Sequence, residues 1–492
     1  MKPISLSLEA VIAPEAAARL PRCRAIAARR AARARSLPYS LEWLDTATGA
    51  LAEAGLALVV PNPGTRLLLR GMPGPEEPWC PGTPPPLLAT LAGNAVPDEA
   101  GGEDLLPLAR FEGQRTTLTL RGGVTGALIQ GVLHAPGGAA EPAARLRLTG
   151  PPRAVAEAMR AIAATQPAAP PPGSLAEQAR ALALGVGYRP RRLGGPLLLA
   201  GMGVEDALAR SIGHLAEVMA WHAPIAAAGT NPAGVHQLRV ALRRLRSVLR
   251  IFRPAADGPS LRAFDAGLKA LAGLLGPARD WDVFLGGLGA ELAAGLPEEP
   301  RVAALLAAGQ ARRDAAYAAL RPALAGPLLR GLVWEAAALE SGHPWRREQR
   351  GEAAVDWRRR PVEEFAAHRL DRSWRRITKV GEAIAALPDA EFHALRLQAK
   401  RLRYAAELFA PLFSRRRSRR FLERLEAVQD QLGLANDVTV ARGLVASLAA
   451  ETGDWASGLA EGWTLARARH ARARAAEAWG ELLGGRPYWN QG

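Results

Sequence analysis

The strongest constraint on how this 492-residue chain can fold is an internal repeat in its second half. A fixed offset of 157 residues superimposes two segments without a gap, starting with His236 on His393. The aligned pairs continue as Arg239 with Arg396, Arg243-Arg244 with Lys400-Arg401, Arg246 with Arg403, Phe252 with Phe409, Leu275-Gly276 with Leu432-Gly433, Asp280 with Asp437, and Arg312 with Arg469. Agreement over several helices and loops at one offset indicates a duplicated helical unit of roughly 150 residues and predicts two related bundles.

A helical wheel shows what the repeat contains. At about 100° per residue, one arc of about 80° holds His236, Arg239, Arg243, Arg246 and Arg250. A separate arc holds the leucines Leu238, Leu242, Leu245 and Leu249. In the second copy the basic arc is formed by His393, Arg396, Lys400 and Arg403, the apolar arc by Leu395, Ala399, Leu402 and Ala406, and Glu407 replaces Arg250. We call the two basic arcs the ridges.

Two interpretations of the ridges are open on spacing alone. Like charges three and four residues apart on a helix repel by roughly 0.2–0.5 kcal/mol per pair. A helix face that is only solvated normally intersperses acids among such charges, yet neither ridge contains an acid before Glu407. The pattern fits either a solvated basic face or an anion-binding surface. Repetition of the whole pattern, histidine included, favours anion binding.

The composition of the chain also favours an anionic partner, although less strongly than the ridges do. The chain has 63 Lys and Arg against 47 Asp and Glu, a net charge of +16 and a pI near 11.0. This excess predicts a polyanionic partner, such as nucleic acid, a phosphate polymer or an anionic membrane. Only four of the basic residues are lysines, and Ala, Gly and Pro are abundant. A GC-rich genome produces the same bias, so the placement of the charges is more informative than their number.

Cysteine usage and apolar runs bear on the compartment. Cys23 and Cys80 are far apart and form neither a zinc spacing nor a disulfide framework, which fits a reducing compartment. The first 20 residues lack the layout of a signal peptide, and no apolar run approaches the roughly 20 residues of a membrane helix. We therefore expect a soluble cytoplasmic protein.

The two parts of the chain differ in their residue patterns. Residues 1–195 contain short apolar or alternating segments, such as "TRLLLRG", "RTTLTLRG" and "ARLRLTG", which predict an antiparallel sheet or barrel. Residues 152–164 have a helical pattern, and Pro- and Gly-rich stretches follow up to about residue 200. From about residue 203 onward, long Ala/Leu/Arg helical patterns dominate. We predict an α+β fold, with a β domain over 1–195 and an all-α domain over 200–490.

The repeated segments resemble the two halves of a CHAD domain, the conserved histidine α-helical domain. The resemblance rests on "VHQLRVALRRLRSVLRIF" and "FHALRLQAKRLRYAAELF", followed by "LAGLLGPARDWDVF" and "VQDQLGLANDVTVA". It implies two pseudo-symmetric four-helix bundles that meet at a basic pore, with inorganic polyphosphate as ligand. By position it marks His236, Arg239, Arg243, Arg246, His393, Arg396, Lys400 and Arg403 as polyphosphate-binding; Arg250 joins them from the ridge, and Arg244, Arg401, Arg312 and Arg469 are weaker candidates.

The chemistry of the ridges suits this ligand. Polyphosphate offers charge but no base to read, and arginine forks match phosphate oxygens bidentately. Protonation of histidine adds a charged donor, so we expect tighter binding below roughly pH 6.5. Single-stranded nucleic-acid modules add aromatic stacking platforms, whereas the ridges have none and aromatics form only 5% of the chain. These features favour polyphosphate over nucleic acid.

The histidines and aspartates of the repeat can also serve other roles. The histidines can serve as metal ligands in principle, but cations crowd around them and no carboxylate accompanies either one on its ridge. We expect neither a metal nor a cofactor. Asp280 and Asp437 follow predicted loops at helix starts, where we expect them to cap the helices or to pair with ridge arginines.

The N-terminal part resembles a CYTH domain, the triphosphate tunnel fold, through "LEWLDTATGALAEAGLALVV", "LARFEGQRTTLTL" and "EPAARLRLTG". The catalytic pattern of that family is missing. The opening Glu-x-Glu-x-Lys of the family falls on Ser5, Ser7 and Glu9, and its later Glu-x-Glu reads Arg145-Leu146-Arg147. The family's basic pair aligns near Val59-Val60, and "LIQG" replaces its Asp-Glu-Gly turn. A tunnel enzyme needs carboxylates to hold Mg²⁺ or Mn²⁺ against triphosphate. We expect a degenerate domain without triphosphatase activity; an unrelated small β-rich domain is the alternative.

The leading hypothesis from the sequence is a non-enzymatic polyphosphate-binding protein of a bacterial cytoplasm, recruited to polyphosphate granules. The rival hypotheses are a metal-dependent inorganic triphosphatase that acts through the N-terminal domain, with surviving acids such as Glu9 and Asp45, and a nonspecific nucleic-acid binder. We expect no membrane partner. The sequence leaves the oligomeric state open.

Overall fold

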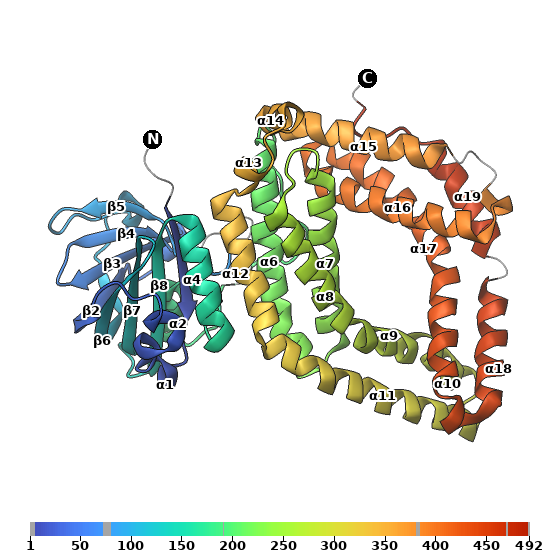
Figure 1. Cartoon of the computed structure of the whole chain (residues 1–492), viewed down its shortest axis with the longest axis horizontal. Helices are drawn as coiled ribbons and strands as arrows, with labels where there is room; N and C mark the ends of the chain where they lie inside the picture. The colour runs from blue at the N-terminus through green and yellow to red at the C-terminus, as the bar shows by residue number, and fades with distance from the viewer. Residues whose placement is uncertain (1–4, 72–79, 190, 380–383, 469–470, 491–492) are drawn as a thin grey trace. The chain divides into compact units, whose positions relative to one another are not determined.

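The computed structural model describes residues 5–71, 80–189, 191–379, 384–468 and 471–490 of the chain (Figure 1). The chain forms two compact units. The first, here called the N-terminal unit, comprises residues 1–194, 212–221 and 326–344. The second, the helical unit, comprises residues 195–211, 222–325 and 345–492.

An eight-stranded antiparallel sheet forms the N-terminal unit, with strand order β1-β8-β7-β6-β2-β3-β4-β5. It curls into a half-barrel (Figure 1). The strands are β1 (Leu6–Val11), β2 (Arg35–Asp45), β3 (Leu56–Asn62), β4 (Arg66–Arg70), β5 (Leu87–Leu91), β6 (Leu106–Leu120), β7 (Val124–His134) and β8 (Ala140–Gly150). The long register between β6 and β7 pairs Arg110 with His134 at one end and Leu120 with Val124 at the other.

Alternation of side chains gives the sheet two different faces. One face carries Leu8 of β1 and Leu146 of β8, which are fully buried against α4 (Pro152–Thr165) and α12 (Pro327–Gly342). The other face carries Trp43, Phe111 and Leu133, which pack with alanines of α5 (Leu175–Leu184). The helix predicted over 152–164 is confirmed by α4. The remaining helices of this part are α1 (Pro14–Ala17), α2 (Arg24–Ala27) and α3 (Ala50–Glu53).

Beyond residue 203 every element of the described chain is helical, and the predicted α+β fold class is confirmed. The helices are α6 (Val204–Ala228), α7 (Pro232–Phe252), α8 (Pro259–Leu274), α9 (Gly276–Phe284), α10 (Ala290–Gly295), α11 (Pro300–Ala325), α12, α13 (Trp345–Glu348), α14 (Glu352–Arg359), α15 (Val362–Thr378), α16 (Asp389–Phe409), α17 (Arg415–Ala446), α18 (Ala449–Ala468) and α19 (Ala471–Leu483). The repeat offset carries α7 onto α16 from the first residue to the last.

The two repeat-equivalent helices α7 and α16 pack against each other in the helical unit. Phe252 and Phe409, which the offset superimposes, meet there with ring centroids 6.0 Å apart. Phe365 of α15 stacks on Phe252 at 5.2 Å. All three rings are fully buried. The aromatic positions conserved between the repeats therefore form the centre at which the repeats join.

One loop predicted from the repeat is not formed. The first copy breaks at Leu275, between α8 and α9, but the second copy runs through Leu432 and Gly433 as the continuous helix α17. Asp280 lies inside α9 rather than at its cap, and the side chain of Asp437 lies outside the described residues. A duplicated sequence pattern therefore does not fix a helix break, because a Leu-Gly pair can continue a helix when packing supports it.

Candidate anion-binding site

The first ridge is carried by α7, whose start is fixed locally. The Asn231 side chain accepts a hydrogen bond from the Ala233 amide at 2.8 Å, and Pro232 occupies the first helical position. The leucine arc is buried as the helical wheel predicts, with Leu238, Leu242 and Leu245 fully inaccessible. Burial of this face fixes the rotation of α7, and the ridge beside it remains at the border of solvent.

The ridge residues nearest the start of α7 form a purely basic cluster with α9. His236 lies close enough to Arg239, Arg243 and Arg279 for their charges to act on it. Burial, followed by these three arginines, lowers the pKa of His236 from the usual 6.5. The charge of Asp280 acts on Arg239, but no ion pair joins the two side chains in the described residues, so pairing with a ridge arginine stays a prediction.

The middle of the predicted site is largely neutralised by carboxylates. Arg246 donates to Asp265 at 2.8 Å. Arg403 donates to Glu407 at 2.7 Å and to Glu426 at 2.9 Å. The Arg244 guanidinium lies 3.6 Å from the same Glu407. These predicted residues brace the helices on one another.

The other predicted residues are dispersed. Arg312, on α11, forms an ion pair with Glu451 at 2.6 Å. His393 is exposed near the start of α16, whereas Arg396 is only 8% exposed and Lys400 is half-buried. Arg469 lies outside the described residues. The candidate residues are therefore not gathered in one place.

A hollow lined by arginines lies at the end of the first ridge. It consists of two adjoining cavities of about 420 Å³ and about 160 Å³ that share Arg250, Arg369, Ser373 and Arg376. The larger is completed by Arg253, Pro254, Asp257 and Arg372, and the smaller by Ile251, Ile377, Gln398, Arg401 and Ala405. We call this hollow the arginine cavity. Of the predicted residues, Arg250 and Arg401 line it.

Three arginines of the cavity come from α15, which the sequence reasoning missed. Arg369, Arg372 and Arg376 are spaced by three and four residues and so share one face of the helix. Glu363 and Glu364 in the first turn and arginines in the last turn match the helix dipole. The sequence signal that could have found these arginines is their i, i+3, i+7 spacing. It is absent from the repeat partner of this segment and therefore did not stand out.

The charges of the arginine cavity are almost uncompensated. Arg253 pairs with Asp257 at 3.2 Å, but Arg250, Arg369, Arg372, Arg376 and Arg401 make no ion pair with a carboxylate of the described residues. Burial lowers the pKa of Arg369, and Arg372 and Arg376 lower it further. The buried Nε of Arg369 has no hydrogen-bond partner in the described chain. Arg369 is half-buried, whereas Arg250, Arg372, Arg376 and Arg401 are exposed. An unpaired, partly desolvated guanidinium group such as that of Arg369 is costly, and an anion in the cavity would supply its missing acceptor.

Side chains that could ligate a metal ion are not clustered in the described residues. No three His, Cys, Asp or Glu side chains gather there in a way that can hold a metal ion. In the N-terminal unit, Glu9 is bound by Arg147 at 2.6 Å and lies 3.6 Å from Arg145. Asp45 accepts hydrogen bonds from the amides of Leu51 and Ala52. Both surviving acids are therefore committed to protein groups. The absence of triphosphatase activity stays a prediction.

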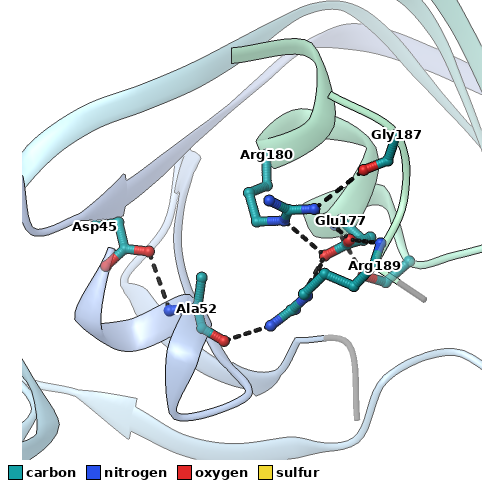
Figure 2. A network of polar contacts seen from close by, with 7 residues as sticks. Asp45, Ala52, Glu177, Arg180, Gly187 and Arg189 are labelled. Atoms are coloured by element: carbon teal, nitrogen blue, oxygen red, sulfur yellow. Dashed lines mark hydrogen bonds and ion pairs between the residues drawn. The ribbon is translucent and has the colours of Figure 1, made fainter. Parts of the chain in front are cut away.

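A second set of ion pairs holds α5 in place in the N-terminal unit. Figure 2 shows the Glu177 carboxylate between Arg180 and Arg189, with contacts of 2.8 and 2.9 Å. The Glu177 side chain is fully buried. Glu177 also accepts from the Arg189 amide at 2.8 Å, and the Arg189 guanidinium reaches the carbonyl of Ala52 at 2.5 Å. Hydrogen bonds from Arg180 and Arg189 lower the pKa of Glu177 although burial opposes them. This network is structural.

Comparison with known proteins identifies the helical part. Residues 210–446 match the family model of the CHAD domain. The crystal structure of the CHAD domain from the plant Ricinus communis is 28% identical, with a TM-score of 0.50 and coverage of 61% of this chain and 98% of that one. PptA from Streptomyces chartreusis is 19% identical, with a TM-score of 0.44 and coverage of 57% and 100%. A putative adenylyl cyclase from Hippeastrum, described as having a dominant triphosphatase activity, is 13% identical, with a TM-score of 0.22 and coverage of 30% and 79%.

The last two similarities are too weak to support an inference. A search of curated proteins found no match. No helix in the described part of the chain is long and apolar enough to cross a membrane.

Proposed function

We propose that this chain, which carries a CHAD domain at residues 210–446, binds inorganic polyphosphate in the arginine cavity. The observation that carries the proposal is a set of five arginines from α7, α15 and α16 around one hollow, which form no ion pair with any carboxylate that the structure describes. Such a site needs an anion that presents several charges to several forks at once. Polyphosphate does so at each successive phosphate and is the ligand that the family resemblance implies.

The lining of the arginine cavity favours polyphosphate over nucleic acid. The residues that line the two hollows in the described chain include no aromatic ring on which a base can stack. Arginine is also the better choice for a permanent charge, because its guanidinium stays protonated even when burial lowers its pKa. The basic cluster around His236 lies on the same helix and would contact a chain that extends along α7.

The proposal is tested by calorimetric titration of long-chain polyphosphate into the full chain at about 0.15 M salt, where exposed charges are already screened beyond about 8 Å. We expect saturable binding that duplex DNA at equal phosphate concentration does not displace, because nonspecific duplex binding weakens steeply with salt. Displacement by DNA, or the absence of saturable binding, would contradict the proposal. Recruitment to polyphosphate granules is part of the same proposal.

A further inference from the structure

We propose that the duplicated scaffold holds one anion site per chain, and that Glu407 weakens the binding of a ligand long enough to extend past it. This inference rests on the proposed function, since it concerns how far a polyphosphate can extend from the arginine cavity. Two contacts between α7 and α16 occupy equivalent positions in the two copies of the repeat.

The offset of 157 residues maps Arg244 onto Arg401 and Arg250 onto Glu407. The contact between Arg244 and Glu407, at 3.6 Å, thus corresponds to the approach of Arg401 to Arg250. The first contact joins opposite charges and the second joins like charges. The like-charged pair lines the smaller hollow of the arginine cavity, whereas Arg244 and Glu407 line neither hollow. The two copies differ at this position, which is Arg250 in the first and Glu407 in the second. As a result, one contact can accept an anion and the equivalent contact is neutral.

Glu407 neutralises Arg403 as well as Arg244. Its carboxylate accepts from Arg403 Nε at 2.7 Å while it faces Arg244, so one acid holds two guanidinium groups. The Glu407 side chain is only 25% exposed, which keeps these charges partly shielded from solvent. Arg244 and Arg403 are consequently occupied, and Glu407 interrupts the basic residues along the seam between α7 and α16.

The α15 arginines have no counterpart in the other repeat. The same offset maps Arg369, Arg372 and Arg376 onto Ile212, Leu215 and Met219 of α6. Those three side chains are fully buried. Removal of Glu407 therefore cannot create a second complete site. It would instead release Arg244, while Arg403 stays paired with Glu426 at 2.9 Å, and would so extend the unpaired basic residues along the seam between α7 and α16.

The consequence is a dependence on ligand length. Tripolyphosphate can fill the arginine cavity without reaching Glu407, whereas a long polyphosphate that continues along the seam meets its negative charge. In the Glu407→Gln variant, long-chain polyphosphate should bind about threefold to tenfold more tightly, because a negative charge is removed from the seam and the half-buried Arg244 is released. Tripolyphosphate should bind with unchanged affinity and with one equivalent per chain.

The experiment titrates both probes into the full chain carrying Glu407→Gln, with Glu423→Gln as the matched control. Glu423 lies on α17, is 63% exposed and, within the described part of the chain, forms its ion pair with the exposed Arg419. Melting temperatures establish that each variant folds. Adding Arg244→Gln to Glu407→Gln should remove part of the gain for long chains, an effect that a general change in stability would not produce.

Three results would overturn the proposal: unchanged long-chain affinity in Glu407→Gln, equal tightening of both probes, or a second tripolyphosphate equivalent on the wild-type chain. Failure of the proposed function is recognised separately, because the wild-type chain would then bind neither probe, and the Glu407 proposal would fall with it.

Discussion

The guanidinium groups of the helical unit differ in what compensates their charge. Arg246 and Arg403 are held by carboxylates at 2.7–2.9 Å, whereas Arg369 has a buried Nε without a partner in the described chain. A paired arginine gains little from a new anion, because binding must first break an existing ion pair. An unpaired, partly desolvated arginine gains more. Binding should therefore depend on the unpaired arginines and much less on the paired ones.

His236 predicts how binding depends on pH. In the free chain its pKa is lowered by burial and by Arg279, Arg243 and Arg239, while Asp280 lies beside Arg239. A polyphosphate chain along α7 brings negative charge to the imidazole and raises its pKa in the complex. The complex then binds more protons than the free chain between the two pKa values. The contribution of His236 to affinity is therefore fully present below the free pKa and is lost as pH rises through the pKa of the complex.

We expect long-chain affinity to increase about threefold to tenfold from pH 8 to pH 5.5, with most of the change below pH 6.5, and to change much less in His236→Gln. Titrations across this pH range check the expectation, with circular dichroism to establish that the fold persists. The same pH dependence in His236→Gln and in the wild type would exclude His236 as its source.

Three helices, α7, α15 and α16, build the arginine cavity, and they are joined by one aromatic cluster. Phe409 contacts Phe252 at 6.0 Å and Phe365 at 6.4 Å between ring centroids, so each of the three helices contributes one ring. Because all three rings are fully buried, their packing fixes the spacing between the arginine-bearing faces. Stability of this cluster and geometry of the cavity are thus linked.

Truncation of the cluster should be costly. Phe409→Ala removes a fully buried ring and should lower the free energy of unfolding by about 3–5 kcal/mol. Leu397→Ala on the same helix, at a side chain that is 41% exposed, should change it by less than about 0.5 kcal/mol. Urea denaturation followed by tryptophan fluorescence compares the two variants. Equal losses would show that the cluster does not hold these helices together.

The sequence predicts α7 and α16 well but says little about α15. The first two helices share a pattern at a fixed offset, so each supports the interpretation of the other. The arginines of α15 correspond to apolar residues of α6, and only the fold brings them to Arg250 and Arg401. Neutralising acids such as Asp265 and Glu426 also come from another helix, the α-helix that follows in the chain. Spacing along one helix therefore finds basic residues but cannot separate paired from unpaired ones.

Over the whole molecule, polar groups are used differently in the two units. In the N-terminal unit, two buried carboxylates are matched by arginines: Glu9 by Arg147, and Glu177 by Arg180 and Arg189. In the helical unit, five of the arginines around one hollow form no ion pair with a carboxylate of the described residues. The departure of the N-terminal sequence from the CYTH catalytic pattern thus corresponds to internal ion pairs. The uncompensated charge lies in the CHAD part of the chain.

The most direct test of polyphosphate binding at the arginine cavity compares neighbouring arginines of α15 in the full chain. Arg369→Gln with Arg376→Gln removes two unpaired cavity charges, whereas Arg375→Gln removes an arginine that is 76% exposed and paired with Asp371 at 2.6 Å. We predict that the double variant loses about tenfold in polyphosphate affinity for each arginine removed and that Arg375→Gln stays within about twofold of wild type. Equal affinities in the two variants would contradict the assignment of the site.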